Sequence, residues 1–268
     1  DARVRVAIVG AGATGVELSA ELFNAASGLR HYGLEGFDDQ RLEVTLLESG
    51  PRILPALPEP LAHAAQAELI QLGVNVKTAS QVVAVEPGCL KTANGGVIQA
   101  DLLVWAAGVK GPDLVERLPG LEMTPNRQLV VRPTLQSTSD DRIFCIGDCA
   151  FFRPGPQAAP VPPRAQSAAQ MAEVAHANVW RLLQGKTLKA FTYRDYGSLV
   201  SLSRYSTVGS LMGNLVGGRM ALEGRLARLV YVSLYRKHLL AVHGFLRGVL
   251  LILVGHVNQV VRPRLKLH

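Results

Sequence analysis

The most constraining feature of the chain is a run of three glycines, spaced Gly-x-Gly-x-x-Gly, between a predicted strand and a predicted helix. Residues 4–9 are short, apolar and β-branched, which is typical of a buried strand, and they end at Gly10. From residue 13 to about residue 29, the apolar residues have helical spacing. Glycine permits a sharp turn at Gly10, close approach of a phosphate at Gly12, and close helix packing at Gly15. The pattern predicts a strand–turn–helix unit of a parallel α/β sheet.

An acid at the end of the next predicted strand, Glu48 after residues 43–47, indicates what this turn binds. In dinucleotide-binding units, the N–H groups of the helix start bind a pyrophosphate and such an acid binds the ribose hydroxyls. Glu48 follows the turn at a longer distance than the usual ~20 residues, so we expect the polar stretch 27–40 to form a surface insertion. The carboxylate favours NAD over NADP, although Arg52 can weaken that preference. The residues predicted to bind NAD(H) are Gly10, Ala11, Gly12, Ala13, Thr14, Gly15 and Glu48; a turn with only a structural role is the alternative.

Strands and helices alternate along the rest of the chain. The pattern predicts a helix over 59–72, strands over 74–77, 81–85 and 102–105, and a hairpin turn at Asn94-Gly95-Gly96. It then predicts strands over 129–131 and 143–146, a proline-rich irregular stretch over 151–163, a helix over 164–183, and extended chain from residue 191. The alternation in the first part indicates a parallel sheet with a small antiparallel insert.

The composition argues against several other classes of protein. A chain of 268 residues with 48% hydrophobic content can bury one or two ordinary cores. The pair Cys145 and Cys149 has neither the spacing nor the neighbouring ligands of a dithiol catalyst or a zinc site, and with Cys89 there is no even-numbered disulfide framework. The histidines are scattered, so we expect no metal site. The chain opens on a charged stretch instead of a secretory signal, which favours a reducing, cytoplasmic setting.

The net charge of +7 is concentrated at the C-terminal end, where residues 219–268 contain nine Lys or Arg and one acid, Glu223. The longest charge-free run there, residues 248–261, is too short for a membrane span, which needs about 20 apolar residues. Apolar clusters interrupted by basic residues are typical of helices that lie on anionic membrane surfaces. We therefore expect a membrane-binding tail. A core helix pair with a basic dimer face is the alternative, and nucleic-acid binding is disfavoured because no reading motif accompanies the charge.

Five motifs, the glycine turn among them, resemble one family of respiratory flavoproteins. They are Gly-Ala-Gly-Ala-Thr-Gly-Val-Glu (10–17), Leu-Leu-Glu-Ser-Gly-Pro-Arg-Ile-Leu-Pro (46–55), Trp-Ala-Ala-Gly-Val (105–109), Ile-Gly-Asp-Cys-Ala (146–150) and Pro-Pro-Arg-Ala-Gln-Ser-Ala-Ala-Gln (162–170). In this order they resemble the type II NADH:quinone oxidoreductases, and the segments 209–215 and 262–268 are similar to bacterial respiratory members. The alanine–glutamine segment and the tail are the most specific parts, because the glycine turn alone fits many flavoproteins.

The resemblance implies an α/β fold with three regions. It implies a Rossmann-like NADH-binding domain with a parallel sheet and a β insert over 1–108, and the later part of a FAD-binding domain with a quinone-side segment over 109–190. An extended segment and an amphipathic, membrane-anchoring helical tail follow over 191–268. The family has an earlier glycine fingerprint for FAD, and no second Gly-x-Gly-x-x-Gly occurs here. We therefore expect that this chain holds only part of the FAD site and lacks the amino-terminal third of such an enzyme.

The resemblance also implies flavin-side residues. Gly147 and Asp148 match the place where the ribityl and phosphate groups of FAD are held, and Gly108 and Ala165 are expected to line the cofactor as well. Glu17 matches a glutamate near the nicotinamide and flavin rings, where a desolvated acid can relay protons to a reduced quinone. The alternatives are a turn residue for Asp148 and an acid that stabilises the first helix turn for Glu17.

Two glutamines match the quinone side of the family. Gln166 and Gln170 lie at the start of the helix that lines the quinone opening, and amide groups can hydrogen-bond a quinone carbonyl without bringing charge into an apolar slot. Some relatives have a histidine where this chain has Ala169, so any proton delivery by that histidine does not transfer. The alternative is that both glutamines lie on a solvated helix face.

The implied function is hydride transfer from NADH to FAD and electron transfer to a membrane quinone, without proton pumping. The resemblance implies a peripheral protein on the cytoplasmic side of a bacterial inner membrane, with a homodimer left open. A soluble NADH-dependent reductase of a small redox protein is one alternative. An NAD-binding, membrane-associating module without turnover is the other.

Overall fold

The computed structural model describes residues 3–29, 41–202, 206–213, 218–223 and 242–261, together with residues 232, 233, 236, 239 and 240. The chain forms two compact units: Asp1–Ala107 with Gly197–His268, and Gly108–Tyr196. The first boundary is within one residue of the predicted end of the first domain. The residues after 196 group with the first unit, although the sequence pattern suggested a separate third region.

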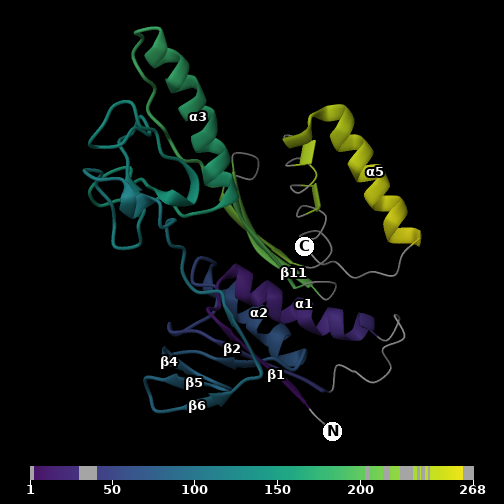
Figure 1. Cartoon of the computed structure of the whole chain (residues 1–268). Helices are drawn as coiled ribbons and strands as arrows, with labels where there is room; N and C mark the ends of the chain where they lie inside the picture. The colour runs from purple at the N-terminus through teal and green to yellow at the C-terminus, as the bar shows by residue number, and fades with distance from the viewer. Residues whose placement is uncertain are drawn as a thin grey trace. The chain divides into compact units, whose positions relative to one another are not determined.

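A four-stranded parallel sheet forms the centre of the first unit (Figure 1). Its strands are β1 (Val4–Val9), β2 (Leu42–Leu47), β3 (Asn75–Lys77) and β7 (Leu102–Trp105), in the order β3-β2-β1-β7. Helices α1 (Ala13–Leu29) and α2 (Glu59–Gln71) connect the first three strands. The predicted parallel sheet is therefore confirmed, and the predicted bounds of β1, α1 and β7 agree with the structure residue for residue.

Successive side chains of β1 point to opposite faces of the sheet, and both faces are buried. Val6 and Ile8 pack in the core that contains α1 and α2, whereas Ala7 and Val9 pack in a second cluster on the opposite face. That second cluster is covered by the antiparallel sheet of β4 (Val82–Glu86), β5 (Cys89–Thr92) and β6 (Val97–Gln99), which contributes the fully buried Leu90. Residues buried on both faces are typical of parallel strands. The small antiparallel insert is confirmed as well.

A second antiparallel sheet packs on the helices of the first unit. Its strands are β10 (Gly197–Leu202), β11 (Ser206–Gly213) and β12 (Gly218–Glu223), paired in chain order. Val200 and Leu202 of β10 are buried in the same core as residues of α1 and α2. These strands complete the hydrophobic environment of α1 and α2, which end at residues 29 and 71, far earlier in the chain.

The second unit has its own core. The unit contains β8 (Leu129–Val130), β9 (Ala150–Phe151), the short 3-10 helices η3 (Val115–Arg117) and η4 (Gly147–Cys149), and the long helix α3 (Ala165–Leu183). Met171 and Ala175 of α3 pack with Phe152 and Phe191, whose rings meet edge to face with centroids 5.4 Å apart. The expected strand over 143–146 is wrong: Phe144 forms only an isolated bridge with Gln136, because the chain here turns at once into η4.

Near the C-terminal end, α5 (Phe245–Val261) is a 17-residue helix with many exposed apolar side chains. Phe245 is 73% exposed, Leu246 83% and Leu250 60%. Among the described residues, none of the helices has the length and apolar character needed to cross a bilayer. Most of residues 224–241 of the basic tail, and the motif at 262–268, lie outside the described residues.

Candidate functional site

The glycine turn has one open position between two crowded ones. A Cβ atom on Gly15 would lie 1.9 Å from the carbonyl oxygen of Gly10, and one on Gly10 would lie 2.7 Å from the Cα atom of Ala107. By contrast, a Cβ atom on Gly12 would meet nothing within 4 Å. Gly10 and Gly15 are therefore required by the contact of β1, α1 and the end of β7. Gly12 leaves space above the backbone, where a phosphate group fits.

Glu48 lies at the edge of this turn. Its carboxylate accepts hydrogen bonds from the backbone N–H of Ala11 at 2.9 Å and of Gly50 at 2.8 Å. The backbone of Glu48 is fixed on both sides, because its N–H donates to Lys77 and its carbonyl accepts from Ser80. The structure therefore brings together the turn and the acid that the sequence predicted, although they are 33 residues apart in the chain. A carboxylate in this place can accept the two hydroxyls of a ribose.

Arg52 does not face this acid but closes its own loop. Its guanidinium group donates to the carbonyl oxygens of Leu54 at 3.2 Å, Leu57 at 3.0 Å and Pro55 at 2.9 Å. The N–H of Leu54 in turn donates to the carbonyl of Ala11 in the glycine turn. Arg52 thus supports the turn indirectly, and a guanidinium group that is engaged in three hydrogen bonds is poorly placed to attract a 2′-phosphate.

The remaining turn residues follow the expected helix start. Ala13 and Thr14 are exposed, and the first helical hydrogen bond runs from Val16 N–H to Gly12 carbonyl at 3.1 Å. Glu17 lies half-buried in the first two turns of α1. Its predicted function in proton relay stays a prediction, as does the contact of Gly108, which has a φ of +79° after β7.

Three of the predicted flavin-side residues, Gly147, Asp148 and Ala165, lie at the contact of η4 with the start of α3 in the second unit. Gly147 has a φ of +69°, which favours glycine, and it starts η4; Asp148 follows it with an exposed side chain. A Cβ atom on Gly147 would lie 3.6 Å from the Cβ of Ala168, so the turn packs on the first turns of α3. Ala165, the first residue of α3, is exposed. An exposed carboxylate after a tight glycine turn, next to a helix start, fits the ribityl and phosphate groups of a flavin dinucleotide.

The two thiols beside this turn are close to each other. The Sγ atoms of Cys145 and Cys149 are 3.5 Å apart, and the Cys149 thiol donates to the carbonyl of Ile146. Burial raises the pKa of Cys145 to about 12, so its thiolate is disfavoured. Among the described residues there is no group of three or more side chains suited to hold a metal ion.

The predicted quinone-side glutamines both bind the segment that returns along α3. The Gln170 amide donates to the carbonyl of Arg194 at 2.9 Å and accepts from the N–H of the same residue at 3.0 Å. Gln166 accepts from the N–H of Tyr196 and donates to the Asp195 carboxylate at 3.2 Å. Both side chains have intermediate exposure and bind backbone groups of the same segment.

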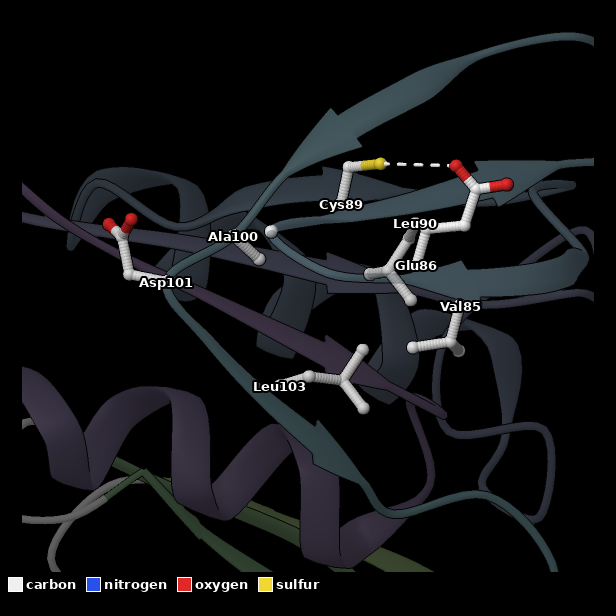
Figure 2. Close-up of a pocket in the computed structure, with 8 residues that line it drawn as sticks. Val85, Glu86, Cys89, Leu90, Ala100, Asp101 and Leu103 are labelled. Atoms are coloured by element: carbon white, nitrogen blue, oxygen red, sulfur yellow. Dashed lines mark hydrogen bonds between the residues drawn. The ribbon is translucent and has the colours of Figure 1, made fainter.

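A small hollow on the first unit lies apart from the predicted site residues. It is lined by residues of the insert sheet and of β7, including Glu86, Cys89 and Asp101 (Figure 2). Glu86 is paired with Lys91, and Asp101 with Arg5, whose guanidinium group and backbone N–H hold the pKa of Asp101 down at about 2. These polar groups pair with one another or with neighbours, which indicates a structural surface.

Comparisons with known proteins agree with this arrangement. The pyridine nucleotide-disulphide oxidoreductase family matches residues 1–172. A protein of Haemophilus influenzae named type II NADH:quinone oxidoreductase is 47% identical over 99% of this chain and 60% of its own length. A protein of the same name from Staphylococcus aureus is 34% identical over 82% of this chain and 55% of its own length. This chain therefore spans about 60% of the length of the curated relatives it matches.

Solved structures support the fold. The structure titled NDH2 from Plasmodium falciparum in complex with NADH has a TM-score of 0.71 at 19% identity and covers 87% of this chain and 62% of its own. A NAD-dependent persulfide reductase from A. fulgidus has a TM-score of 0.59 at 22% identity, over 79% of this chain and 36% of its own. The resemblance that the sequence motifs suggested is confirmed by the curated relatives.

Several supporting residues escaped the sequence analysis. Gly50, Asn178 and Asp195 bind predicted site residues or the segment beside them. Arg52 was considered only for its effect on nucleotide choice, and its contacts with its own loop were missed. Asn178 had a usable signal, because it is an amide three helical turns after Gln166 on the same predicted helix. Asp195 had none, since only the fold brings it next to Gln166.

Proposed function

Because the chain belongs to the pyridine nucleotide-disulphide oxidoreductase family, we propose that it binds NADH at the glycine turn and passes its electrons through FAD to a membrane quinone. The observation with most weight is the turn itself, where Gly12 is open and the Glu48 carboxylate lies beside Ala11. The names of the curated relatives support the choice of quinone as the electron acceptor.

The residues of the first unit do the binding and orienting in this proposal. The start of α1 offers N–H groups and the positive end of its dipole to the pyrophosphate, while Glu48 accepts the ribose hydroxyls. FAD, when bound, supplies the hydride acceptor and the two-electron chemistry that no side chain can provide. In the second unit, Gly147 and Asp148 would hold the ribityl and phosphate groups, and Gly108 and Ala165 would line the cofactor.

Glu17 is the proposed proton carrier. A half-buried carboxyl in the first turns of α1 can hold a proton near the nicotinamide end of the site. Glu17→Gln should therefore impair quinone reduction more than NADH binding. Equal losses in both would count against the relay and favour a helix-stabilising role.

The quinone side is placed at the start of α3 in this proposal. The amides of Gln166 and Gln170, and the segment 194–196 that they bind, form the polar part of the opening. The Asp195 carboxylate there is paired with Arg164, and the two amides are uncharged, which suits a neutral quinone head group.

The proposed electron acceptor is tested with a water-soluble short-chain quinone. Protein purified with added FAD is expected to show the flavin absorbance bands and to oxidise NADH only when the quinone is present. Colourless protein that binds NADH without oxidising it would instead indicate a binding module. Yellow protein that reduces a small redox protein but no quinone would indicate the soluble reductase.

Glu48 predicts the choice of nucleotide. NADH should be preferred to NADPH by about tenfold or more, because a carboxylate that accepts ribose hydroxyls repels a 2′-phosphate. The comparison of kcat/KM for the two nucleotides checks this, with Glu48→Gln expected to narrow the ratio. Equal use of both nucleotides by the unaltered protein would refute the assignment.

The tail is proposed to bind the membrane surface without crossing it, on the cytoplasmic side of a bacterial inner membrane. The exposed Phe245, Leu246 and Leu250 of α5 would enter the interface, with the basic residues of 219–268 against anionic lipid. The same face could instead join two copies in a homodimer.

Vesicle flotation separates these two possibilities. Deleting residues 219–268 would also remove β12, so a triple variant Phe245→Ser, Leu246→Ser, Leu250→Ser is the cleaner test. It should lose binding to anionic vesicles. A control with Ser at Val83, Val85 and Val97, which are also exposed at 54–60%, should float normally. Unchanged flotation of the α5 variant would refute the anchor, and a change from dimer to monomer would support the alternative.

A further inference from the structure

Three amide side chains of α3 bind one continuous segment of the chain. Gln170 pairs with both backbone groups of Arg194, and Asn178 pairs in the same way with Lys189, accepting from its N–H at 2.8 Å and donating to its carbonyl at 2.9 Å. Gln166 binds the N–H of Tyr196 and the side chain of Asp195. The segment 189–196 therefore runs antiparallel to α3. The amide side chains bind its backbone groups as a neighbouring strand would. We call these three side chains the amide ladder.

The polarity of the partners leaves one orientation for each amide. A backbone N–H only donates and a carbonyl or carboxylate only accepts. Gln166 must therefore direct its carbonyl to Tyr196 and its amino group to Asp195, and a flipped amide would face two like groups. The same holds for Gln170 against Arg194. The ladder thus fixes both the position of the segment and the direction of the two quinone-side amides.

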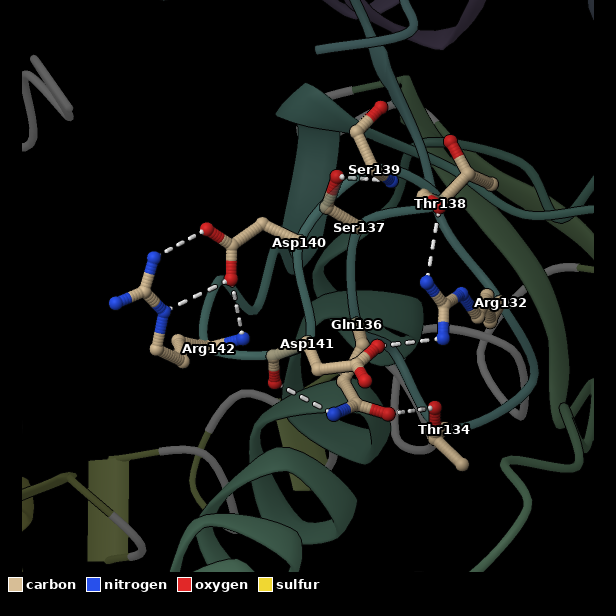
Figure 3. A network of polar contacts seen from close by, with 9 residues as sticks. All are labelled: Arg132, Thr134, Gln136, Ser137, Thr138, Ser139, Asp140, Asp141 and Arg142. Carbon is tan, nitrogen blue, oxygen red and sulfur yellow. Dashed lines mark hydrogen bonds and ion pairs between the residues drawn. The ribbon is translucent and has the colours of Figure 1, made fainter. Parts of the chain in front are cut away.

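The ladder is anchored at its far end in the core of the second unit. Asn178 is fully buried, and its amino group also donates to the carbonyl of Thr134 at 3.0 Å. Thr134 belongs to a polar network in which Gln136 and Arg132 bind the turn at Asp141 (Figure 3). This turn precedes the Gly147-Asp148 pair in the chain. At the near end, Arg164 lies 3.8 Å from the Asp195 carboxylate.

We propose that Asn178 and Asp195 are positioning residues of the quinone side: with Gln166 and Gln170 they hold the segment 189–196 in one register along α3, and Asp195 sets the orientation of the Gln166 amide. This rests on the proposed function only for its link to quinone. The register itself is a property of the second unit. Without the ladder, the segment keeps the buried Phe191, whose N–H donates to the carbonyl of Pro133, and the packing of Tyr193 on the core of the second unit.

The register is tested by amide hydrogen exchange across residues 187–196. Gln170→Glu keeps the size of the side chain but places a carboxylate against the Arg194 carbonyl, so exchange in this segment should rise about tenfold or more. Gln184→Glu makes the same chemical change at an exposed position just beyond the end of α3 and should leave exchange unaltered. Asn178→Asp should act more strongly at Lys189. If it does not fold, the Gln170 variant still decides. Unchanged exchange in Gln170→Glu would overturn the ladder.

The link to quinone is tested with Asp195. Asp195→Ala removes the acceptor for the Gln166 amino group, so the KM for a short-chain quinone should rise about tenfold while kcat changes little. Asp195→Asn keeps an acceptor oxygen and should restore most of the KM. A KM unchanged in both variants, or equal losses of kcat in both, would overturn the positioning of Gln166. If the unaltered protein reduces no quinone, the proposed function fails. The hydrogen-exchange results would still test the register of the segment independently.

Discussion

Gly12 and Gly15 belong to the same turn, yet a side chain would meet different surroundings at the two positions. Gly15→Ala forces a methyl group against the Gly10 carbonyl, so we expect a loss of about 2 kcal/mol or more in the free energy of unfolding. Gly12→Ala finds open space and should fold with almost unchanged stability, but its methyl group would occupy the place proposed for the pyrophosphate.

The two variants are compared by thermal unfolding and by titration with NADH. Gly12→Ala should bind NADH at least about tenfold more weakly, which corresponds to about 1.4 kcal/mol. If Gly12→Ala bound NADH as tightly as the unaltered protein, the turn would have a structural function only.

The buried thiol of Cys145 predicts a pH effect of definite sign. Its pKa is raised from 9.0 to about 12 by burial, so between these values the folded protein retains a proton that the unfolded chain has lost. Stability is therefore fully present below pH 9 and falls as the pH rises toward 12. Thermal melts at about pH 8 and about pH 10 should show a larger decrease for the unaltered protein than for Cys145→Ala. An equal decrease in both would contradict the assignment.

Among the elements, β10 has an effect far from its place in the chain. Leu202 is fully buried in the core formed with α1 and α2, so Leu202→Ala should lower the free energy of unfolding by about 2–5 kcal/mol. Leu183→Ala, at a leucine of α3 that is 73% exposed, is the matched control and should change stability little. Denaturant unfolding measures both. A small effect at Leu202 would mean that β10 does not complete this core.

The elements that were predicted well are those with local signals. β1, α1 and β7 could be placed because strand composition, glycine punctuation and helical spacing agree within a few residues. The apolar run 143–146 looked like a strand, but it makes one bridge only and turns into η4, and a four-residue apolar run cannot reveal this. β11 and β12 were missed because β11 has two glycines in eight residues and the two strands depend on pairing with each other.

The candidate site likewise has parts that local sequence patterns predict and parts that they do not. The glycine turn and Glu48 follow from a strand–turn–helix pattern, and their closeness is imposed by the parallel pairing of β1 with β2. The partners of Gln166 and Gln170 could not be predicted, because they lie 24–30 residues away along an irregular segment. Nor does the sequence reveal that Arg52 is engaged by carbonyl groups of its own loop.

For the whole molecule, the division into two units predicts a local response to ligand. NADH should stabilise the unit of residues 1–107 and 197–268, by about 2.7 kcal/mol at a ligand concentration one hundred times Kd, and leave residues 108–196 unaffected. Hydrogen exchange with and without NADH would reveal this as protection in α1, β2 and β10 alone. Equal protection throughout both units would indicate that they unfold together.

The discontinuity of the first unit has a consequence for the order in which the protein folds during translation. β1, α1, β2 and α2 leave the ribosome well before Val200 and Leu202, which cover these helices and emerge only after all of residues 108–196. A nascent chain that pauses before residue 197 would expose an apolar helix surface and is a natural substrate for chaperones. The nucleotide site is thus synthesised before the strands that complete the unit around it, and it becomes stable only after they have emerged.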